Sequence, residues 1–246
     1  MRSSRRATPI VPPATIGMLG GGQLGRYALM AARTMGYRTV VLEPDPGATA
    51  GAVADVHLVA PYDDDDALRR LGEECDVVTT EFENPPAAAL AALDRRTLVA
   101  PSPAAVAIAQ DRIAEKRFLS GAGLPVGPYG VVTAPDDDPA VTYPAILKTA
   151  RLGYDGKGQR RVADSREMRA AWRTLGAEAC VLESALPLDL ELSAVVARDP
   201  GGGFAAFPVA ENTHVDGVLD VSVVPARIPA RLADRVVGLA MTIADA

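Results

Sequence analysis

The order of apolar and polar positions from Thr15 onward predicts a strand, a helix and a second strand. Residues 15–45 read TIGMLGGGQLGRYALMAARTMGYRTVVLEPD. This segment contains an apolar run, a glycine cluster, a stretch with a helical period that ends at Gly36, and a second apolar run that ends at Glu43. Such strand–helix–strand units build parallel sheets.

Short apolar runs and helical stretches continue to alternate up to residue 100. The runs of strand length are 56–59, 76–80 and 97–100. Four aspartates at 63–66 precede a helical stretch at 67–71, where they would cap and charge its N-terminus, and we assign them no site role. Strands that alternate with helices indicate a doubly wound parallel sheet. Because Pro101 and Pro103 mark a boundary, we expect a Rossmann-like domain at 15–110.

The pattern after residue 110 mixes helices, strands and β-ribbon, and we place a second domain at 111–246. Residues 104–122 have a continuous helical period across this boundary. The elements that follow are a strand at 143–150, a glycine-rich loop at 152–162, a helix at 165–175, a strand at 179–186, and ribbon segments at 191–199 and 204–226. A last helix at 231–246 has an apolar stripe, which is typical of a contact surface. The stripe consists of Leu232, Val236, Ala240 and Ile243.

Composition excludes several classes of protein. The apolar residues never form a run long enough for a bilayer, and residues 1–14 carry arginines but no apolar core of a signal peptide, so we expect a disordered tail and no membrane partner. Cys75 and Cys180 fit neither a disulfide framework nor a metal motif, which favours a reducing cytoplasm. With 25 basic and 31 acidic residues and no basic stripe, small molecules are favoured over nucleic acids as partners.

The basic residues are unusual because only three of the 25 are lysines, namely Lys116, Lys148 and Lys157. Lysine is a compact point charge, and arginine cannot replace it in a narrow phosphate pocket. Chance is an equally acceptable explanation for three retained lysines.

Two glycine-rich segments are candidates for phosphate binding. Gly20, Gly22 and Gly25 form G-x-G-x-x-G between a strand and a helix, which is typical of a dinucleotide or other anion site, although a tight turn alone explains them too. In the loop at 153–159, glycines flank Lys157 after a strand that contains Lys148, so the loop fits a flap over a triphosphate. A plain glycine hairpin is the alternative.

Other polar residues complete the candidates. Glu183 and Glu191 bracket SALPLDL, an apolar connection that could offer backbone groups to an adenine and a carboxylate to ribose, or both could be solvated strand ends. His57 and His214 are the only histidines, so we assign no metal ligands. We expect His57 at a sheet edge and His214 in a polar turn between strands.

Five motifs, taken in order, resemble one enzyme family. They are GGGQLGR at 20–26, EFEN at 81–84, D-R-x3-K at 111–116, GYDGKGQ at 153–159 and ENTHVDG at 211–217. The chain from Thr15 to its last residue resembles the 5-(carboxyamino)imidazole ribonucleotide synthetases, ATP-grasp ligases of purine biosynthesis. The resemblance implies an α/β chain in which the Rossmann-like domain is followed by an ATP-grasp domain.

The resemblance also implies a reaction. ATP, with Mg2+, would phosphorylate bicarbonate to carboxyphosphate, which carboxylates the amine of 5-aminoimidazole ribonucleotide and leaves ADP and phosphate. Asp155 would be the catalytic proton carrier. The nucleotide contacts would be Arg112 and Lys148 for phosphates, Gly153, Tyr154, Asp155, Gly156, Lys157, Gly158 and Gln159 for the flap, Glu183, Ser184, Ala185 and Leu186 for the adenine, Glu191 for the ribose, and His214. The substrate would lie against Gly22, Gln23, Glu81 and Tyr154.

One departure from the family pattern leads to further expectations. The segments that supply the family's magnesium-binding and substrate-phosphate residues are absent from the 246 residues, so we expect an incomplete ATP-grasp domain that does not turn over by itself. Family precedent and the apolar stripe indicate a homodimer. The alternatives are a catalytically incomplete nucleotide-binding protein, and an NAD-dependent Rossmann oxidoreductase that uses the turn at 20–25 and Glu43.

Overall fold

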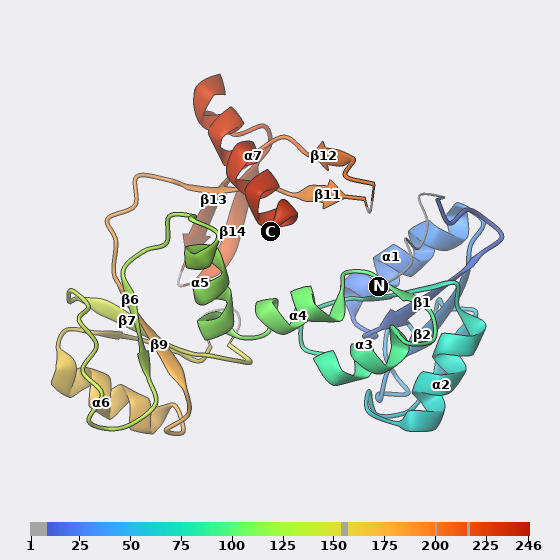
Figure 1. Cartoon of the computed structure of the whole chain (residues 1–246), viewed down its shortest axis with the longest axis horizontal. Helices are drawn as coiled ribbons and strands as arrows, with labels where there is room; N and C mark the ends of the chain where they lie inside the picture. Colours follow the sequence, from blue (N-terminus) through green and yellow to red (C-terminus); the bar gives the residue numbers. More distant parts are fainter. Residues whose placement is uncertain (1–8, 154–156, 200, 216) are drawn as a thin grey trace. The chain divides into compact units, whose positions relative to one another are not determined.

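The computed structural model describes residues 9–153, 157–199, 201–215 and 217–246, and the chain forms two compact units (Figure 1). The first unit is Met1–Gln110 and the second is Asp111–Ala246. Most of the predicted tail, residues 1–8, lies outside the described residues. Residues 9–14 belong with the first sheet, since the Tyr37 hydroxyl donates to the carbonyl of Ile10 and the Arg38 amide donates to that of Ala14.

The first unit is built on a five-stranded parallel sheet in the order β3-β2-β1-β4-β5, as the alternating pattern predicts. Its strands are β1 (Thr15–Leu19), β2 (Arg38–Leu42), β3 (Val56–Leu58), β4 (Val77–Thr80) and β5 (Leu98–Val99). Its helices are α1 (Gln23–Thr34), α2 (Asp65–Glu74), α3 (Ala87–Leu93) and α4 (Pro103–Ala109). His57 lies in β3, at the sheet edge where it was expected.

Both faces of this sheet are covered, because alternate residues of the central strands enter different apolar clusters. Leu19 and Val40 pack in one cluster with residues of α2 and α3. Their neighbours Met18 and Val41 pack in another with Leu29 of α1. The central strands are therefore apolar at nearly every position, as expected of a parallel sheet buried on two sides.

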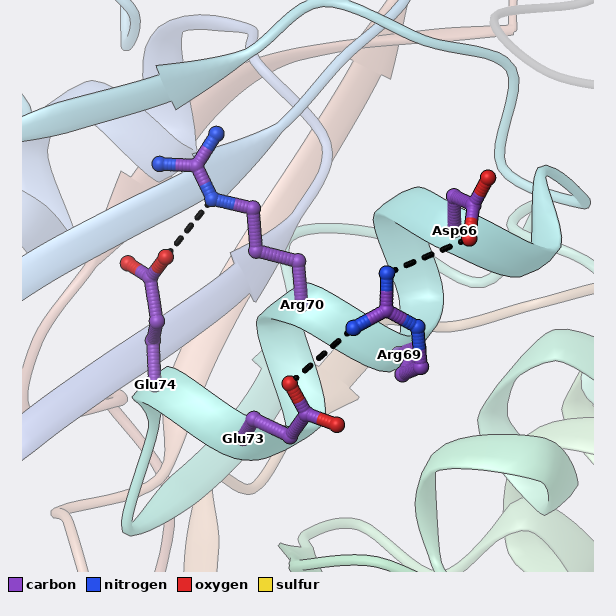
Figure 2. Close-up of polar contacts among 5 residues, drawn as sticks. All are labelled: Asp66, Arg69, Arg70, Glu73 and Glu74. Atoms are coloured by element: carbon purple, nitrogen blue, oxygen red, sulfur yellow. Dashed lines mark hydrogen bonds and ion pairs between the residues drawn. The ribbon is translucent and has the colours of Figure 1, made fainter.

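The aspartate run begins α2, as predicted. The side chain of Asp64 accepts a hydrogen bond of 2.8 Å from the amide of Ala67, which caps the helix. Figure 2 shows the ion pairs that follow on the exposed face of the helix. These pairs are Asp66–Arg69, Arg69–Glu73 and Arg70–Glu74.

The helix predicted at 104–122 is wrong as a single element, because the chain breaks between α4 and α5 (Arg112–Gly121). Asp111 has an extended backbone, and its carboxylate accepts from the amides of Ile113 and Ala114. A new helix therefore starts at Asp111, which is also the first residue of the second unit.

The second unit contains a four-stranded antiparallel sheet in the order β6-β9-β7-β8. The strands are β6 (Tyr129–Val132), β7 (Ala145–Thr149), β8 (Gln159–Val162) and β9 (Cys180–Ser184). Helix α6 (Ser165–Thr174) covers one face, where its Met168 and Trp172 pack on Leu147 and Leu182. Helix α5 packs against β9 on the other side (Figure 1). Polar side chains of β7 and β9 share that face.

The rest of the second unit buries few residues. Strands β10 (Glu191–Ser193), β13 (Ala210–Val215) and β14 (Val218–Val223) form an antiparallel sheet, and β11 (Val196–Arg198) pairs with β12 (Phe204–Ala206). Helix α7 (Ala230–Asp245) buries none of its residues, so the predicted stripe keeps solvent contact. In the described part of the chain, no helix is long and apolar enough to cross a membrane.

The two cysteines are free thiols, and each is buried in a different unit. Burial raises the pKa of Cys75 to about 12 and that of Cys180 to about 11. Both side chains therefore remain protonated at neutral pH and act as small apolar residues.

We predict that Asp64→Ala destabilises the first unit by about 0.5–2 kcal/mol, because an amide at the N-terminus of α2 loses its acceptor. Urea denaturation followed by circular dichroism measures the loss. Asp63→Ala is the matched control, since it removes a neighbouring aspartate that does not cap the helix. Equal midpoints for Asp64→Ala and the unmodified protein would show that the cap contributes nothing.

Candidate functional site

Two lysines meet one glutamate on the face of the β6-β9-β7-β8 sheet opposite α6. Leu147 and Leu182 point into the core, so the next residues, Lys148 of β7 and Glu183 of β9, point the other way. Lys148 Nζ lies 3.0 Å from Glu183 Oε2, and Lys116 Nζ of α5 lies 3.2 Å from Glu183 Oε1. These side chains are only 17–22% exposed, so the charges are partly withdrawn from water.

The charges of this cluster stabilise one another. Burial alone would raise the pKa of Glu183, but the hydrogen bond and charge of Lys148, together with Lys116, outweigh it and hold the pKa below its ordinary value. Lys116 Nζ also lies 5.6 Å from the centre of the Tyr129 ring, within the range of a cation–π contact. The result is a site with two fixed ammonium groups and one ionised carboxylate.

The glycine-rich loop is anchored beside this cluster at both of its described ends. Arg112 donates to the carbonyl of Gly153 at 3.3 Å, and the amide of Thr149 donates to the carbonyl of Gly158 at 2.8 Å. Gly158 has a φ of +71°, and a Cβ there would meet the Thr149 hydroxyl, so only glycine fits. Gln159 continues into β8 opposite Lys148. The predicted residues Tyr154, Asp155 and Gly156 lie outside the described residues.

Glu191 and His214 are brought together on neighbouring strands of the β10-β13-β14 sheet. His214 Nδ1 lies 2.8 Å from Glu191 Oε2, and both side chains are more than a third exposed. The expectation of a polar turn at His214 is wrong, because the residue lies in β13 with a register shift beside it. Pairing with β10 and β14 holds the polar sequence Glu-Asn-Thr-His extended, which the local composition does not indicate.

In the apolar connection after β9, two backbone amides already donate hydrogen bonds to carbonyls of the protein. The amide of Ser184 donates to the carbonyl of Pro128, and that of Ala185 donates to the carbonyl of Pro144. The Ser184 hydroxyl accepts from the amide of Thr142. Leu186, the last of the four predicted residues, has a half-exposed side chain.

A cavity of about 500 Å3 lies at the carboxyl ends of β1, β2 and β4 in the first unit. It includes the three described residues that were predicted to contact the substrate, Gly22, Gln23 and Glu81. No motif in the sequence indicates Tyr62, which also lines the cavity. The full lining is Gly21, Gly22, Gln23, Glu43, Asp45, Gly47, Ala48, Thr49, Tyr62, Glu81 and Phe82.

Protein carboxylates, rather than an open anion site, meet the amides of the glycine turn. The Gly21 amide donates to Glu43 Oε2 at 2.9 Å, and the Gly22 amide donates to Glu81 Oε2 at 2.6 Å. A Cβ on Gly21 would collide with Glu43, and a Cβ on Gly22 would collide with Glu81. The glycines are needed for this close approach, so the turn does not offer these amides to a dinucleotide phosphate as the oxidoreductase alternative requires.

No metal ligands are assigned to this chain. Among residues 9–153, 157–199, 201–215 and 217–246, no group of three or more His, Cys, Asp or Glu side chains is arranged to hold a metal ion.

Comparison with known families accounts for both units. Residues 13–110 match the family described as "Ribonucleotide synthetase preATP-grasp domain". Residues 117–246, more than half of the chain, match the ATP-grasp domain. The chain belongs to the ATP-grasp family. The predicted α/β fold class, with a Rossmann-like domain followed by an ATP-grasp domain, is confirmed.

Individual ATP-grasp relatives confirm the resemblance inferred from the motifs. The chain is 44% identical over 236 residues to an N5-carboxyaminoimidazole ribonucleotide synthase of Brucella melitensis, and the match covers 92% of this chain and 64% of that protein. A crystal structure of such a synthetase with ADP aligns with a TM-score of 0.91 at 38% identity, over 98% of this chain and 65% of the other. This ATP-grasp chain therefore spans less than two thirds of the length of these relatives.

A third relative was solved with two ligands. The N5-carboxyaminoimidazole synthase of Aspergillus clavatus, in complex with ADP and 5-aminoimidazole ribonucleotide, aligns with a TM-score of 0.82 at 25% identity. The match covers 94% of this chain and 62% of that one.

We predict that Glu183→Gln reduces the dependence of stability on pH in acid. Because the folded pKa of Glu183 lies below its ordinary value of 4.5, its ionised form stabilises the fold above that pH. This contribution is lost as the pH falls from there through the folded pKa. Urea unfolding from pH 7 to pH 3 should therefore show a smaller fall in stability for Glu183→Gln than for the unmodified protein.

The matched control for this prediction is Glu178→Gln, an exposed glutamate in the same unit. Its pH profile should follow that of the unmodified protein. If Glu183→Gln also follows it, the two lysines do not stabilise the Glu183 carboxylate.

Proposed function

We propose that this chain acts in the ATP-dependent carboxylation of 5-aminoimidazole ribonucleotide with bicarbonate, which gives 5-(carboxyamino)imidazole ribonucleotide, ADP and phosphate in cytoplasmic purine biosynthesis. The observation that carries the proposal is the cluster of Lys116, Lys148 and Glu183, which lies on the sheet face opposite α6 and beside an anchored glycine-rich loop. Fixed ammonium groups beside a loop of backbone amides suit the phosphates of a nucleotide.

Each part of the nucleotide has candidate partners in the second unit. Lys148 and Arg112 would bind phosphates, since Arg112 is already directed at Gly153 at one end of the loop. Glu191 would accept from ribose hydroxyls, and His214, at 2.8 Å from it, would hold that carboxylate in place. Because the Ser184 and Ala185 amides are used within the protein, an adenine contact from this connection would come from Leu186 or from backbone carbonyls.

The cavity of the first unit would receive the second substrate. Its lining supplies Glu81 and the glycine turn, and it has the volume of a small-ligand site. By family resemblance, Asp155 is the proposed proton carrier. A flap over the phosphates would keep water from carboxyphosphate, which hydrolyses readily.

The proposal also concerns a metal ion and the oligomeric state. The family resemblance implies Mg2+, but the described residues provide no matching cluster of ligands, so no step is assigned to the metal. A homodimer is supported by α7, whose sixteen residues are all at least partly exposed.

We predict that Lys148→Ala weakens ATP binding about 10- to 100-fold, which corresponds to the loss of one charge-assisted hydrogen bond of about 1.5–3 kcal/mol. Isothermal titration calorimetry measures the affinity. Arg166→Ala is the control, because it removes one positive charge from α6 on the opposite face of the sheet. An unchanged affinity for Lys148→Ala would contradict the nucleotide site.

The reaction is tested by ADP release from the purified protein. We expect any ADP release to depend on both 5-aminoimidazole ribonucleotide and bicarbonate. Release that needs neither would contradict the proposed carboxylation.

A further inference from the structure

The Glu43 carboxylate is the centre of a hydrogen-bond network in the wall of the first-unit cavity. Oε2 accepts from the Gly21 amide at 2.9 Å and from the Tyr62 hydroxyl at 2.5 Å. Oε1 accepts from the Asp45 amide at 3.1 Å. Three donors from different parts of the first unit therefore hold this side chain in one position.

The network places negative charge at the amides of the glycine turn, where a phosphate would otherwise bind. Glu43 and Glu81 are bonded to successive amides of the turn, and Asp45 adds a third carboxylate to the lining. Of the described residues that form this lining, none is a lysine or arginine. A phosphate entering the turn would have to displace two bound carboxylates and approach a third like charge.

Carboxylate oxygens are acceptors only, so the same wall suits groups that donate hydrogen bonds. We propose that Glu43, positioned by Tyr62, is a specificity-determining residue that excludes phosphate from the glycine turn and directs hydroxyl and amino groups of the ligand into this cavity. The identity of the ligand, 5-aminoimidazole ribonucleotide, rests on the proposed function. Its ribose hydroxyls and amine are the matching donors, and its phosphate lies away from the turn.

Tyr62 acts through Glu43 and is a positioning residue. Burial, together with the hydrogen bond to Glu43 and the negative charges of Glu43 and Glu81, raises the pKa of the phenol well above its usual range. The hydroxyl therefore remains a donor, and it leaves Glu43 no freedom to turn away from Gly21.

The test uses calorimetry on the 246-residue chain with three probes: 5-aminoimidazole ribonucleoside, which lacks the phosphate, the corresponding ribonucleotide, and inorganic phosphate. We expect the ribonucleoside to bind within about tenfold of the ribonucleotide. Inorganic phosphate in large excess should not reduce its affinity. A ribonucleoside that fails to bind, or that phosphate displaces, would overturn the proposal.

Two variants separate specificity from a merely structural role. Glu43→Gln keeps the shape of the side chain but loses its charge, so ribonucleoside affinity should fall roughly tenfold or more and inorganic phosphate should become a competitor. Tyr62→Phe should shift both values in the same direction by a smaller factor, since Glu43 retains two other donors. Glu73→Gln, the same substitution on the exposed face of α2, should change neither.

A structural role alone would weaken every ligand and lower the melting temperature without making phosphate a competitor. That result for Glu43→Gln would overturn the proposal. The ATP affinity of the same variants should not change, because the proposed ATP site lies in the second unit. If the unmodified chain binds the ribonucleoside but does not bind ATP, the result contradicts the proposed function. The role proposed for Glu43 is not affected by that result.

Discussion

Hydrogen bonds to glutamate side chains at the ends of strands organise both candidate sites. In the first unit Glu43 and Glu81 extend from the ends of β2 and β4 to the amides that begin α1. In the second, Glu183 near the end of β9 joins lysines from a strand and a helix. Each carboxylate would be costly to leave partly buried without partners, and each partner would otherwise point unpaired into its site. The strands place these glutamates, which then hold the glycine turn in the first unit and the two lysines in the second.

The large elements could be predicted because their signals are local. The turn at 20–22, the alternating strands up to β5 and the strand that carries Lys148 follow from apolar periodicity and glycine positions. The loop predicted at 152–162 is wrong at its end, because residues 159–162 form β8 by pairing with β7. The break before α5 was missed because the apolar period continues across it, while the cap at Asp111 is a single side-chain interaction. His214 was misplaced for a different reason, since pairing with distant strands decided its conformation.

The sequence could indicate candidate residues for the sites, but not the contacts that these residues make. Sequence reasoning named Lys148, Glu183 and Glu81 as candidates, but no sequence rule says that a second lysine reaches Glu183 or that carboxylates meet the glycine amides. Such contacts join residues 22 positions apart, as between Gly21 and Glu43, or 59 positions apart, as between Gly22 and Glu81, and they depend on the finished sheet. Two of the three lysines converge within 3.2 Å of one carboxylate, a pairing that the scarcity of lysine does not specify.

The two buried thiols give this chain a built-in pair of reporters. Cys75 belongs to the first unit and Cys180 to the second, and a thiol-specific reagent can modify either one only when its surroundings open. The modification rate of each cysteine, read separately by peptide mass, therefore measures the opening of its own unit. A ligand that slows labelling at Cys180 but not at Cys75 would be assigned to the ATP-grasp unit without any substitution in the protein.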